Sequence, residues 1–329
     1  MKRKQAISIL LSVCLTLGAL GILGTWWLFQ PVDTNNSAPQ TFVIPAGASV
    51  TKIANSLKDA RLIRSSELFR IYVWKTGMKN RIQAGTFTLT PNQSLTEIAL
   101  ALTKGTSDVW ITITEGLRGE EIGEQLEQAL PNFDTKSPEF QTACMANEGR
   151  LFPETYLVPK QYNTTQVCQL LRREFETQLA TLQPDVDQQE KAKGLSEFDF
   201  VTIASLVERE AKTQTDRKKV AGVLFNRLEI GMALQIDATL QYAKGYDAKN
   251  KTWWSPPASI DKNIVSPYNT YKNVGLPPTP ISNPSLDSLA AVAKPTPSDY
   301  LYYLTAPDGT TYFAETYEEH QINIAKYLR

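Results

Sequence analysis

Two glutamates near the end of one predicted helix are the residues best suited to acid–base chemistry. On a helical wheel that starts at Phe200 and turns about 100° per residue, the apolar residues from Ile203 onward gather on one face. Glu208 falls about 60° from the centre of that face, and Glu210 falls about 100° away on the opposite flank. The wheel therefore predicts that Glu208 is the more buried of the two carboxylates.

A buried glutamate has a definite chemical use. Apolar surroundings raise the pKa of a carboxylic acid, and a glutamate that stays protonated near neutral pH can act as a general acid. The alternative is an ordinary solvated glutamate at the edge of an amphipathic helix. The start of this helix is marked by Ser196 and, three residues later, Asp199, which is the spacing of a capping box.

Composition excludes several other kinds of chemistry. Lys+Arg and Asp+Glu are each 34, so the formal net charge of zero gives no electrostatic case for nucleic-acid binding. One histidine, three cysteines and no CxxC motif offer too few soft ligands for a zinc site, and we expect neither metal nor cofactor. Cys14 lies in an apolar stretch, whereas Cys144 and Cys168 could pair in an oxidising compartment; the sequence leaves that pairing open.

The N-terminus has the pattern of a membrane anchor. Three basic residues at positions 2–4 precede an uncharged run over 7–29, which is long enough to cross a bilayer as a helix. The basic end should stay in the cytoplasm, with Trp26 and Trp27 at the opposite interface. The alternative is a cleaved signal peptide, but the run exceeds the usual apolar region of such peptides. We expect an uncleaved anchor over 1–30, a linker over 31–40, and the remainder outside the cytoplasmic membrane.

A strand, a turn and a helix occur three times between residues 41 and 132. The copies begin at 42–50, 87–95 and 111–116, and each leads into helical apolar spacing. Ser49 and Ser94 stand where helix N-caps are expected, and 68–74 predicts a further helix. Units this small must pack on their neighbours. The arrangement resembles the LysM-like glycan-binding module; a small α/β spacer is the alternative.

Several motifs occur in the order found in one family. The segments are 148–156 (EGRLFPETY), 204–210 (ASLVERE), 219–228 (KVAGVLFNRL), 231–239 (GMALQIDAT), 266–271 (SPYNTY) and 275–284 (GLPPTPISNP). Together they resemble the MltG (YceG-like) family of endolytic murein transglycosylases, over nearly the whole chain. The predicted fold class is α+β: one N-terminal transmembrane helix, a LysM-like βααβ-type module over 41–132, and a mixed α/β catalytic domain over 133–329.

The resemblance implies roles for particular residues. It makes Glu208 the catalytic glutamate, and it places five further residues along the glycan cleft: Gln235, Asp237, Tyr268, Asn269 and Thr270. It also implies peptidoglycan glycan strands as substrate, 1,6-anhydroMurNAc ends as product, a part in ending glycan elongation and a peptidoglycan synthase as a conceivable partner.

The residues themselves are compatible with these roles. Gln235 and Asp237 sit two apart in an extended stretch, so both point the same way and could bond sugar hydroxyls. The alternative is a turn in which Asp237 caps a helix. Tyr268 offers an aromatic surface to a sugar, whereas loop packing is the expected job of Tyr271. His320 is as compatible with the surface as with a site.

The mechanism implied by the resemblance needs one acid. Glu208 would protonate the glycosidic oxygen and then accept the proton of the C6 hydroxyl as that hydroxyl attacks C1, an intramolecular step favoured by high effective concentration. One alternative is a muramidase with Glu208 as acid and Asp237 as base, because glycosidases pair two carboxylates. The other is an anchored glycan-binding scaffold without activity.

Overall fold

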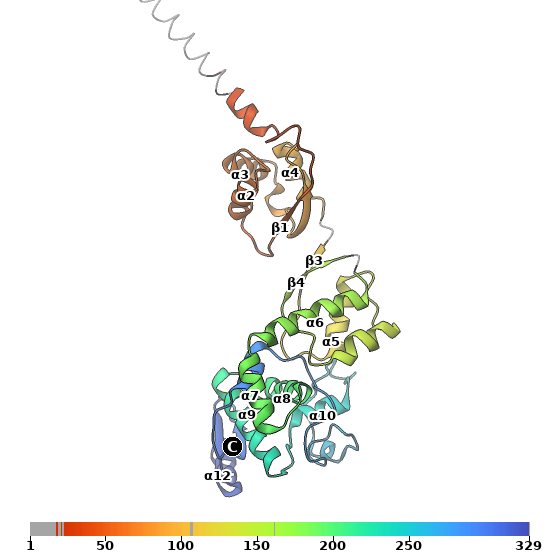
Figure 1. The fold of residues 1–329 in the computed structure, drawn as a ribbon, viewed down its shortest axis with the longest axis vertical. Coiled ribbons are helices and arrows are strands. Elements are labelled where there is room, and N and C mark those ends of the chain that lie inside the picture. Colours follow the sequence, from red (N-terminus) through yellow and green to blue (C-terminus); the bar gives the residue numbers. More distant parts are fainter. Residues whose placement is uncertain (1–17, 19–20, 22, 106–107, 161, 329) are drawn as a thin grey trace, which may run out of the picture. The chain divides into compact units, whose positions relative to one another are not determined.

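The chain forms two compact units. The computed structural model describes residues 18, 21, 23–105, 108–160 and 162–328 (Figure 1). The first unit comprises the described residues up to Trp110 together with Leu157–Lys160, and the second comprises those of 111–156 and 161–329. Most of the apolar run 7–29 lies outside the described residues, and none of the helices described is both long and apolar enough to cross a membrane.

The first unit packs helices on a two-stranded sheet. Its elements are β1 (Gln40–Ile44), α2 (Val50–Asp59), α3 (Ser66–Lys75), β2 (Gly85–Leu89) and α4 (Leu95–Ala101). β1 and β2 run antiparallel, with Phe42 opposite Phe87 in the core. The predicted N-caps are confirmed, because the hydroxyl oxygens of Ser49 and Ser94 accept hydrogen bonds from the third backbone N–H of α2 and α4.

The third predicted copy is divided between the two units after Trp110, and its helix lies in the second. Its strand, β3 (Asp108–Thr112), pairs with β4 (Thr155–Pro159), and the backbone N–H of Ile113 donates to the carbonyl of Glu154 at 2.9 Å. The helix that follows, α5 (Gly119–Ala129), buries Ile122 and Leu126 there. The three copies therefore do not form one compact unit, because the third finds a strand partner further along the chain. The LysM-like assignment of 41–132 stays a prediction.

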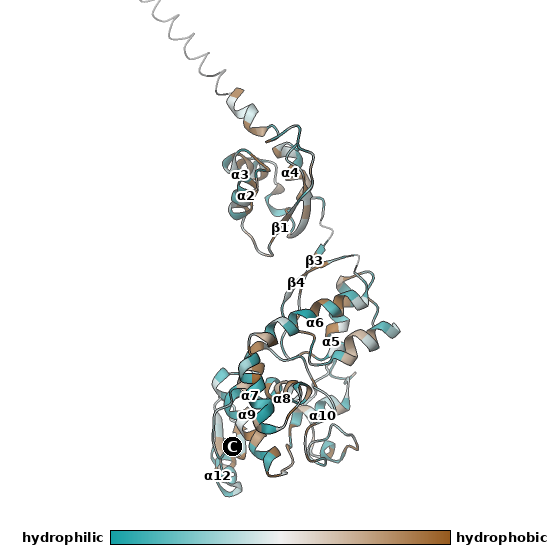
Figure 2. Cartoon of the chain, viewed as in Figure 1, coloured by the Kyte–Doolittle hydropathy of each residue, from teal (hydrophilic) through white to brown (hydrophobic). Residues whose placement is uncertain are grey.

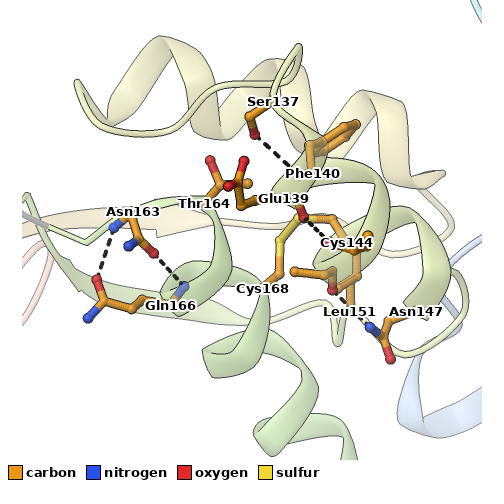
Figure 3. The surroundings of a disulfide bond; sticks show 12 residues. Ser137, Glu139, Phe140, Cys144, Asn147, Leu151, Asn163, Thr164, Gln166 and Cys168 are labelled. Carbon is orange, nitrogen blue, oxygen red and sulfur yellow. Dashed lines mark hydrogen bonds between the residues drawn. A yellow bond between two sulfur atoms is a disulfide. The ribbon is translucent and has the colours of Figure 1, made fainter.

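A disulfide fastens the next part of the second unit. Cys144 ends a π-helical turn (Phe140–Cys144), and it is bonded to Cys168 in α6 (Thr164–Ala180), with their Cα atoms 5.3 Å apart (Figure 3). Asn163 caps α6 by accepting from the backbone N–H of Gln166. Hydrophilic and hydrophobic residues alternate along α5 and α6, as expected of helices with one buried face (Figure 2).

The core of the second unit is built around α8 (Glu197–Glu210). All eight residues from Phe200 to Val207 are buried, and α9 (Gln214–Glu229) and α11 (Leu286–Ala293) pack on this helix. α7 (Gln183–Lys193) precedes it. The predicted capping box is confirmed: Ser196 Oγ accepts from the backbone N–H of Asp199, and Asp199 accepts from that of Ser196. Mixed helices and small sheets thus bear out the predicted α+β character.

The last part of the chain adds a hairpin and a helix. After α10 (Asp237–Lys244) and a 3-10 turn (Ser259–Asn263), β5 (Tyr302–Thr305) and β6 (Thr311–Ala314) pair antiparallel. The final helix, α12 (Tyr317–Tyr327), packs on both strands of this hairpin. None of its residues is fully buried, so α12 is a surface layer of the second unit.

Candidate functional site

A polar cavity of about 500 Å³ lies in the second unit. It is bounded by the end of α8, the start of α10, the hairpin and α12. The residues that line it are Glu210, Arg227, Gln235, Asp237, Lys262, Tyr271, Tyr302, Tyr303, Leu304, Thr305, Tyr317, His320 and Gln321. Carboxylates, cations and aromatic rings thus line one concave site, which is the composition expected of a pocket that binds polar groups of a ligand.

Glu210, the last residue of α8, lies in this cavity. The hydroxyl of Tyr303 donates a hydrogen bond to its Oε2 at 2.9 Å, and the backbone N–H of Ala238 also donates to the carboxylate. Burial raises the pKa of Glu210, and the nearby Asp237 carboxylate raises it further; the two hydrogen bonds and Arg209 oppose this. A carboxylic acid in these surroundings favours its protonated form, as a general acid requires.

Asp237 and Gln235 both line the cavity, but the extended stretch predicted for them is wrong, because Gln235 has a left-handed backbone conformation and Asp237 begins a helix. Asp237 is the first residue of α10, and the hydroxyl of Tyr271 donates to its Oδ1 at 2.7 Å. Gln235 has a φ of 51°, a backbone conformation that costs a non-glycine residue about 1–3 kcal/mol. Its N–H donates to the Thr270 carbonyl at 3.0 Å, and the next N–H, of Ile236, donates to Thr270 Oγ1 at 3.0 Å. These bonds hold the conformation.

Basic and aromatic side chains form the rest of the lining. Arg227 donates to the carbonyls of Leu301 and Leu234, each at 2.6 Å. The ring of Tyr302 stacks on that of His320, with centroids 5.3 Å apart. Burial and the Arg227 charge lower the pKa of His320, whose buried Nδ1 has no hydrogen-bond partner among the residues described. His320 therefore lines the cavity, and a functional role for it stays a prediction.

Glu208 has different surroundings from those expected. Its side chain is only 5% exposed, so the predicted burial is confirmed, but it is not among the residues that line the cavity. Arg217 Nη2 donates to its Oε1 at 2.9 Å, and the backbone N–H and the hydroxyl of Ser285 donate to its Oε2. The expectation of apolar surroundings is wrong, because α9 and the start of α11 bring polar groups to this carboxylate.

Three of the residues predicted to line the cleft instead hold loops together. Buried Asn269 donates to the carbonyls of Lys262 and Ile264, and buried Thr270 is bonded to Thr239. Tyr268 shares a hydrogen bond with Thr279 and packs on the hydrophobic core. None of the three lines the described cavity, whereas Tyr271, predicted to pack a loop, does.

Several lining residues were missed. Tyr303 lies in the Tyr-Leu-Tyr-Tyr segment 300–303, and Arg227 follows Asn226 in the helical segment 219–228. Asn226 donates to the carbonyls of Ser298 and Tyr300, so it draws the C-terminal segment against α9. The polar pair Asn226–Arg227 within a helix, for which the sequence predicted no partner, was the only local sign of this contact between α9 and the C-terminal segment.

A cavity that combines two neighbouring carboxylates with aromatic rings is an arrangement typical of proteins that act on carbohydrates. The sequence profile of the YceG-like family matches residues 42–326. An endolytic murein transglycosylase of Bacillus subtilis is 32% identical over 327 residues, covering 92% of this chain and 88% of the relative. This chain belongs to the YceG-like family.

Two further relatives extend the comparison. An endolytic murein transglycosylase of Streptococcus pneumoniae is 30% identical over 353 residues; the match covers 95% of this chain but only 63% of the relative's own length. A crystal structure of a yceG-like protein from Listeria monocytogenes is 30% identical and matches with a TM-score of 0.57. It covers 87% of this chain and 99% of that one.

Proposed function

We propose that this chain is an endolytic murein transglycosylase with Glu210 as its acid and base. Membership of the YceG-like family and the names of its relatives support the activity. The observation that supports the assignment of Glu210 is its position in the polar cavity, beside Asp237 and under a hydrogen bond from Tyr303. The cavity is the site for the scissile bond of the glycan.

The reaction needs one group that first donates and then accepts a proton. Protonated Glu210 donates its proton to the glycosidic oxygen as the bond from that oxygen to C1 of MurNAc breaks. The resulting carboxylate then accepts the proton of the C6 hydroxyl as that oxygen bonds to C1 and closes a 1,6-anhydro ring. The intramolecular hydroxyl replaces water as nucleophile because it is held at high effective concentration.

Geometry favours Glu210 over Glu208 for this role. Both oxygens of Glu208 accept hydrogen bonds from Arg217 or Ser285, and its side chain is almost wholly covered. A general acid must come within hydrogen-bond reach of the substrate oxygen. Glu208 therefore fits the role of a group that fixes the end of α8, while Glu210, two residues on, reaches the cavity.

Asp237 and Gln235 complete the proposed machinery. The positive charge that develops at C1 in an oxocarbenium-like transition state is stabilised by a nearby carboxylate or dipole. Asp237 is held by Tyr271 and Gln235 by its unusual backbone, so both are positioned before substrate binds. Preorganisation of this kind avoids the cost of reorienting groups during the reaction.

The position of Asp237 in the cavity is also compatible with a second candidate function. A muramidase would use Glu210 as acid and Asp237 as base to activate a water molecule, and two carboxylates in one cavity suit that mechanism. The products distinguish the two reactions, because hydrolysis leaves a reducing end and transglycosylation leaves a 1,6-anhydro end.

The decisive experiment compares Glu210→Gln with Glu208→Gln. Both variants are incubated with murein glycan, released ends are identified by mass spectrometry, and circular dichroism checks folding. Glu210→Gln should lose about 10²–10⁴-fold or more in rate, with anhydro ends as the wild-type product. A folded, inactive Glu208→Gln beside an active Glu210→Gln would overturn the assignment, and reducing ends would support the muramidase.

The cellular setting follows from the same proposal. The glycan substrate lies outside the cytoplasmic membrane, and the basic residues at positions 2–4 before an uncharged run favour an anchored chain with its catalytic part on that side. Cutting within nascent strands would end their elongation, next to a peptidoglycan synthase. Protease treatment of intact spheroplasts tests the orientation: it should digest the catalytic part without lysis.

A further inference from the structure

Two cations in the cavity have no carboxylate partner. Lys262 and Arg227 both line it, and among the residues described neither has a nitrogen within 4.0 Å of an Asp or Glu oxygen. Other lysines of the second unit do form such pairs: Lys244 lies 2.7 Å from Asp261, and Lys193 lies 2.8 Å from Glu229. The cavity therefore holds two cations that form no direct ion pair within the described part of the chain, although the carboxylates of Asp237 and Glu210 line the same cavity.

Lys262 does not form an ion pair with Asp261, the carboxylate next to it in sequence. The side chain of Asp261 accepts instead from Lys244 and from the backbone N–H of Ala258. The Lys262 ammonium lies 4.7 Å from the centre of the Tyr271 ring, an attractive contact that leaves its N–H donors free to bind a ligand. Asn269 donates to the Lys262 carbonyl at 3.1 Å and so fixes the segment at the cavity.

Arg227 supplies a second, buried positive charge. It is 7% exposed, and its hydrogen bonds to the described residues are all to backbone carbonyls, which satisfy N–H groups without cancelling the charge. Its guanidinium lies 5.4 Å from the centre of the Tyr302 ring in the cavity wall. A buried cation of this kind favours an anion in the cavity, since attraction between charges is stronger at low dielectric than in water.

We infer that Lys262, supported by the field of Arg227, recognises a carboxylate carried by the saccharide substrate. The inference rests on the proposed function and adds to it the chemical group that selects the substrate. In murein, every second sugar carries a lactyl ether, whose carboxyl is either free or linked to a peptide that bears its own carboxylates. Chitin has the same backbone without that group. The carboxylate is the chemistry that the two murein forms share.

The test measures binding separately from cleavage. In the Glu210→Gln background, calorimetry follows binding of three probes of equal sugar length: peptide-bearing murein oligomers, the same oligomers stripped of peptide, and chitin oligosaccharides. Lys262→Met should weaken binding of a carboxylate-bearing probe about fivefold, the scale of one partly exposed ion pair, and leave chitin unchanged. Added salt should reduce the difference. Lys249→Met, an exposed lysine outside the cavity lining, is the matched control.

The outcomes separate the possibilities. Loss of affinity for peptide-bearing glycan alone assigns the carboxylate to the peptide. Loss for the stripped glycan alone assigns it to the lactyl group, whose carboxyl is an amide in the peptide-bearing probe, and loss for both probes means that the site accepts either carboxylate. An equal loss for chitin, or no loss for either murein probe, overturns the inference. Mass spectrometry of the probes after calorimetry shows whether the Glu210→Gln background has cleaved them, so failure of the acid assignment appears as product, whereas failure of this inference appears as unchanged affinity for intact probes.

Discussion

Glu208 and Glu210 leave the end of one helix toward different surroundings. The Glu208 carboxylate is bonded to Arg217 of α9 and to Ser285 at the start of α11, so it ties three helices of the core together. The Glu210 carboxylate meets a tyrosine hydroxyl, a second carboxylate and open space. At the scale of single residues, one glutamate is bonded to two other helices of the core, and the other lines a cavity.

Replacing Glu208 should cost stability rather than catalysis. Glu208→Ala leaves the guanidinium of Arg217, whose side chain is 10% exposed, without its nearest carboxylate. Removal of one partner of a buried pair typically destabilises by about 3–5 kcal/mol, and the lower end is expected here because Asp287 and Glu115 still lie 3.5 and 3.9 Å from Arg217. Chemical denaturation should therefore give a markedly lower free energy of unfolding for Glu208→Ala, with much of the specific activity retained by the folded fraction. Unchanged stability would contradict the structural role.

A third buried glutamate predicts how stability depends on pH. Glu148 accepts hydrogen bonds from the Gly119 N–H and from Asn283, and burial raises its pKa to about 8. The folded state then binds a proton more tightly than the unfolded state, so this contribution is full below the ordinary pKa of 4.5 and is lost as pH rises through about 8.

The check is a comparison across that range. The free energy of unfolding of the wild type, minus that of Glu148→Gln, should fall as pH rises from about 5 to 9, because glutamine does not titrate. Glu97→Gln is a suitable control, since hydrogen bonds from Ser94 lower the pKa of Glu97 and its contribution has the opposite sign. A flat difference for Glu148→Gln would rule out the shift.

Sequence reasoning reached the burial of Glu208 but not its partners. The wheel placed Glu208 beside the apolar face, which depends only on local helical geometry, and its side chain is 5% exposed. Arg217 and Ser285 come from other helices. No local pattern could reveal that their hydrogen bonds to Glu208 offset the cost of burying its charge. The same limit hid Tyr303, which reaches Glu210 from a strand 93 residues further on.

At the scale of elements, local signals were dependable and long-range pairing was not. Ser49, Ser94 and Ser196 cap the helices that they were predicted to cap, since capping involves residues only three apart. The third strand–helix copy was assigned to the wrong neighbours because β3 pairs with β4, more than 40 residues away along the chain. A repeated local pattern does not determine which strand becomes a partner.

The disulfide is the element-scale feature that most directly invites a test. Cys144 and Cys168 are 24 residues apart, and closing a loop of this length should stabilise the folded state by about 3 kcal/mol. The double variant Cys144→Ala/Cys168→Ala should unfold at correspondingly lower denaturant. The wild type in reducing buffer should behave like the variant, and a wild type that is insensitive to reduction would contradict this expectation.

At the scale of the whole molecule, each unit has its own core. The hydrophobic cluster of the first unit is formed by residues between Phe42 and Leu102, and that around α8 by residues from Phe152 onward. A fragment of residues 108–329 contains both β3 and β4, together with the entire cavity. We therefore expect it to fold cooperatively and to cleave short soluble glycan at close to the full-length rate.

The same fragment tests the module that it lacks. If residues 41–104 bind glycan, as the LysM-like resemblance implies, the fragment should bind polymeric murein more weakly than the full chain in a pull-down assay. Equal binding would identify this part as a spacer. A fragment that is aggregated or inactive on short glycan would instead contradict the independence of the second unit.

The C-terminal hairpin and α12 form one wall of the cavity, and this wall differs from the other walls in how firmly it is packed. Tyr303, which donates to Glu210, lies in β5, and His320 lies in α12, none of whose residues is fully buried. Segments with few buried residues open locally at a lower free energy than a packed core. Local opening of this wall separates Tyr303 from Glu210 while α8 stays packed, so the cavity can lose its geometry without unfolding of the whole unit.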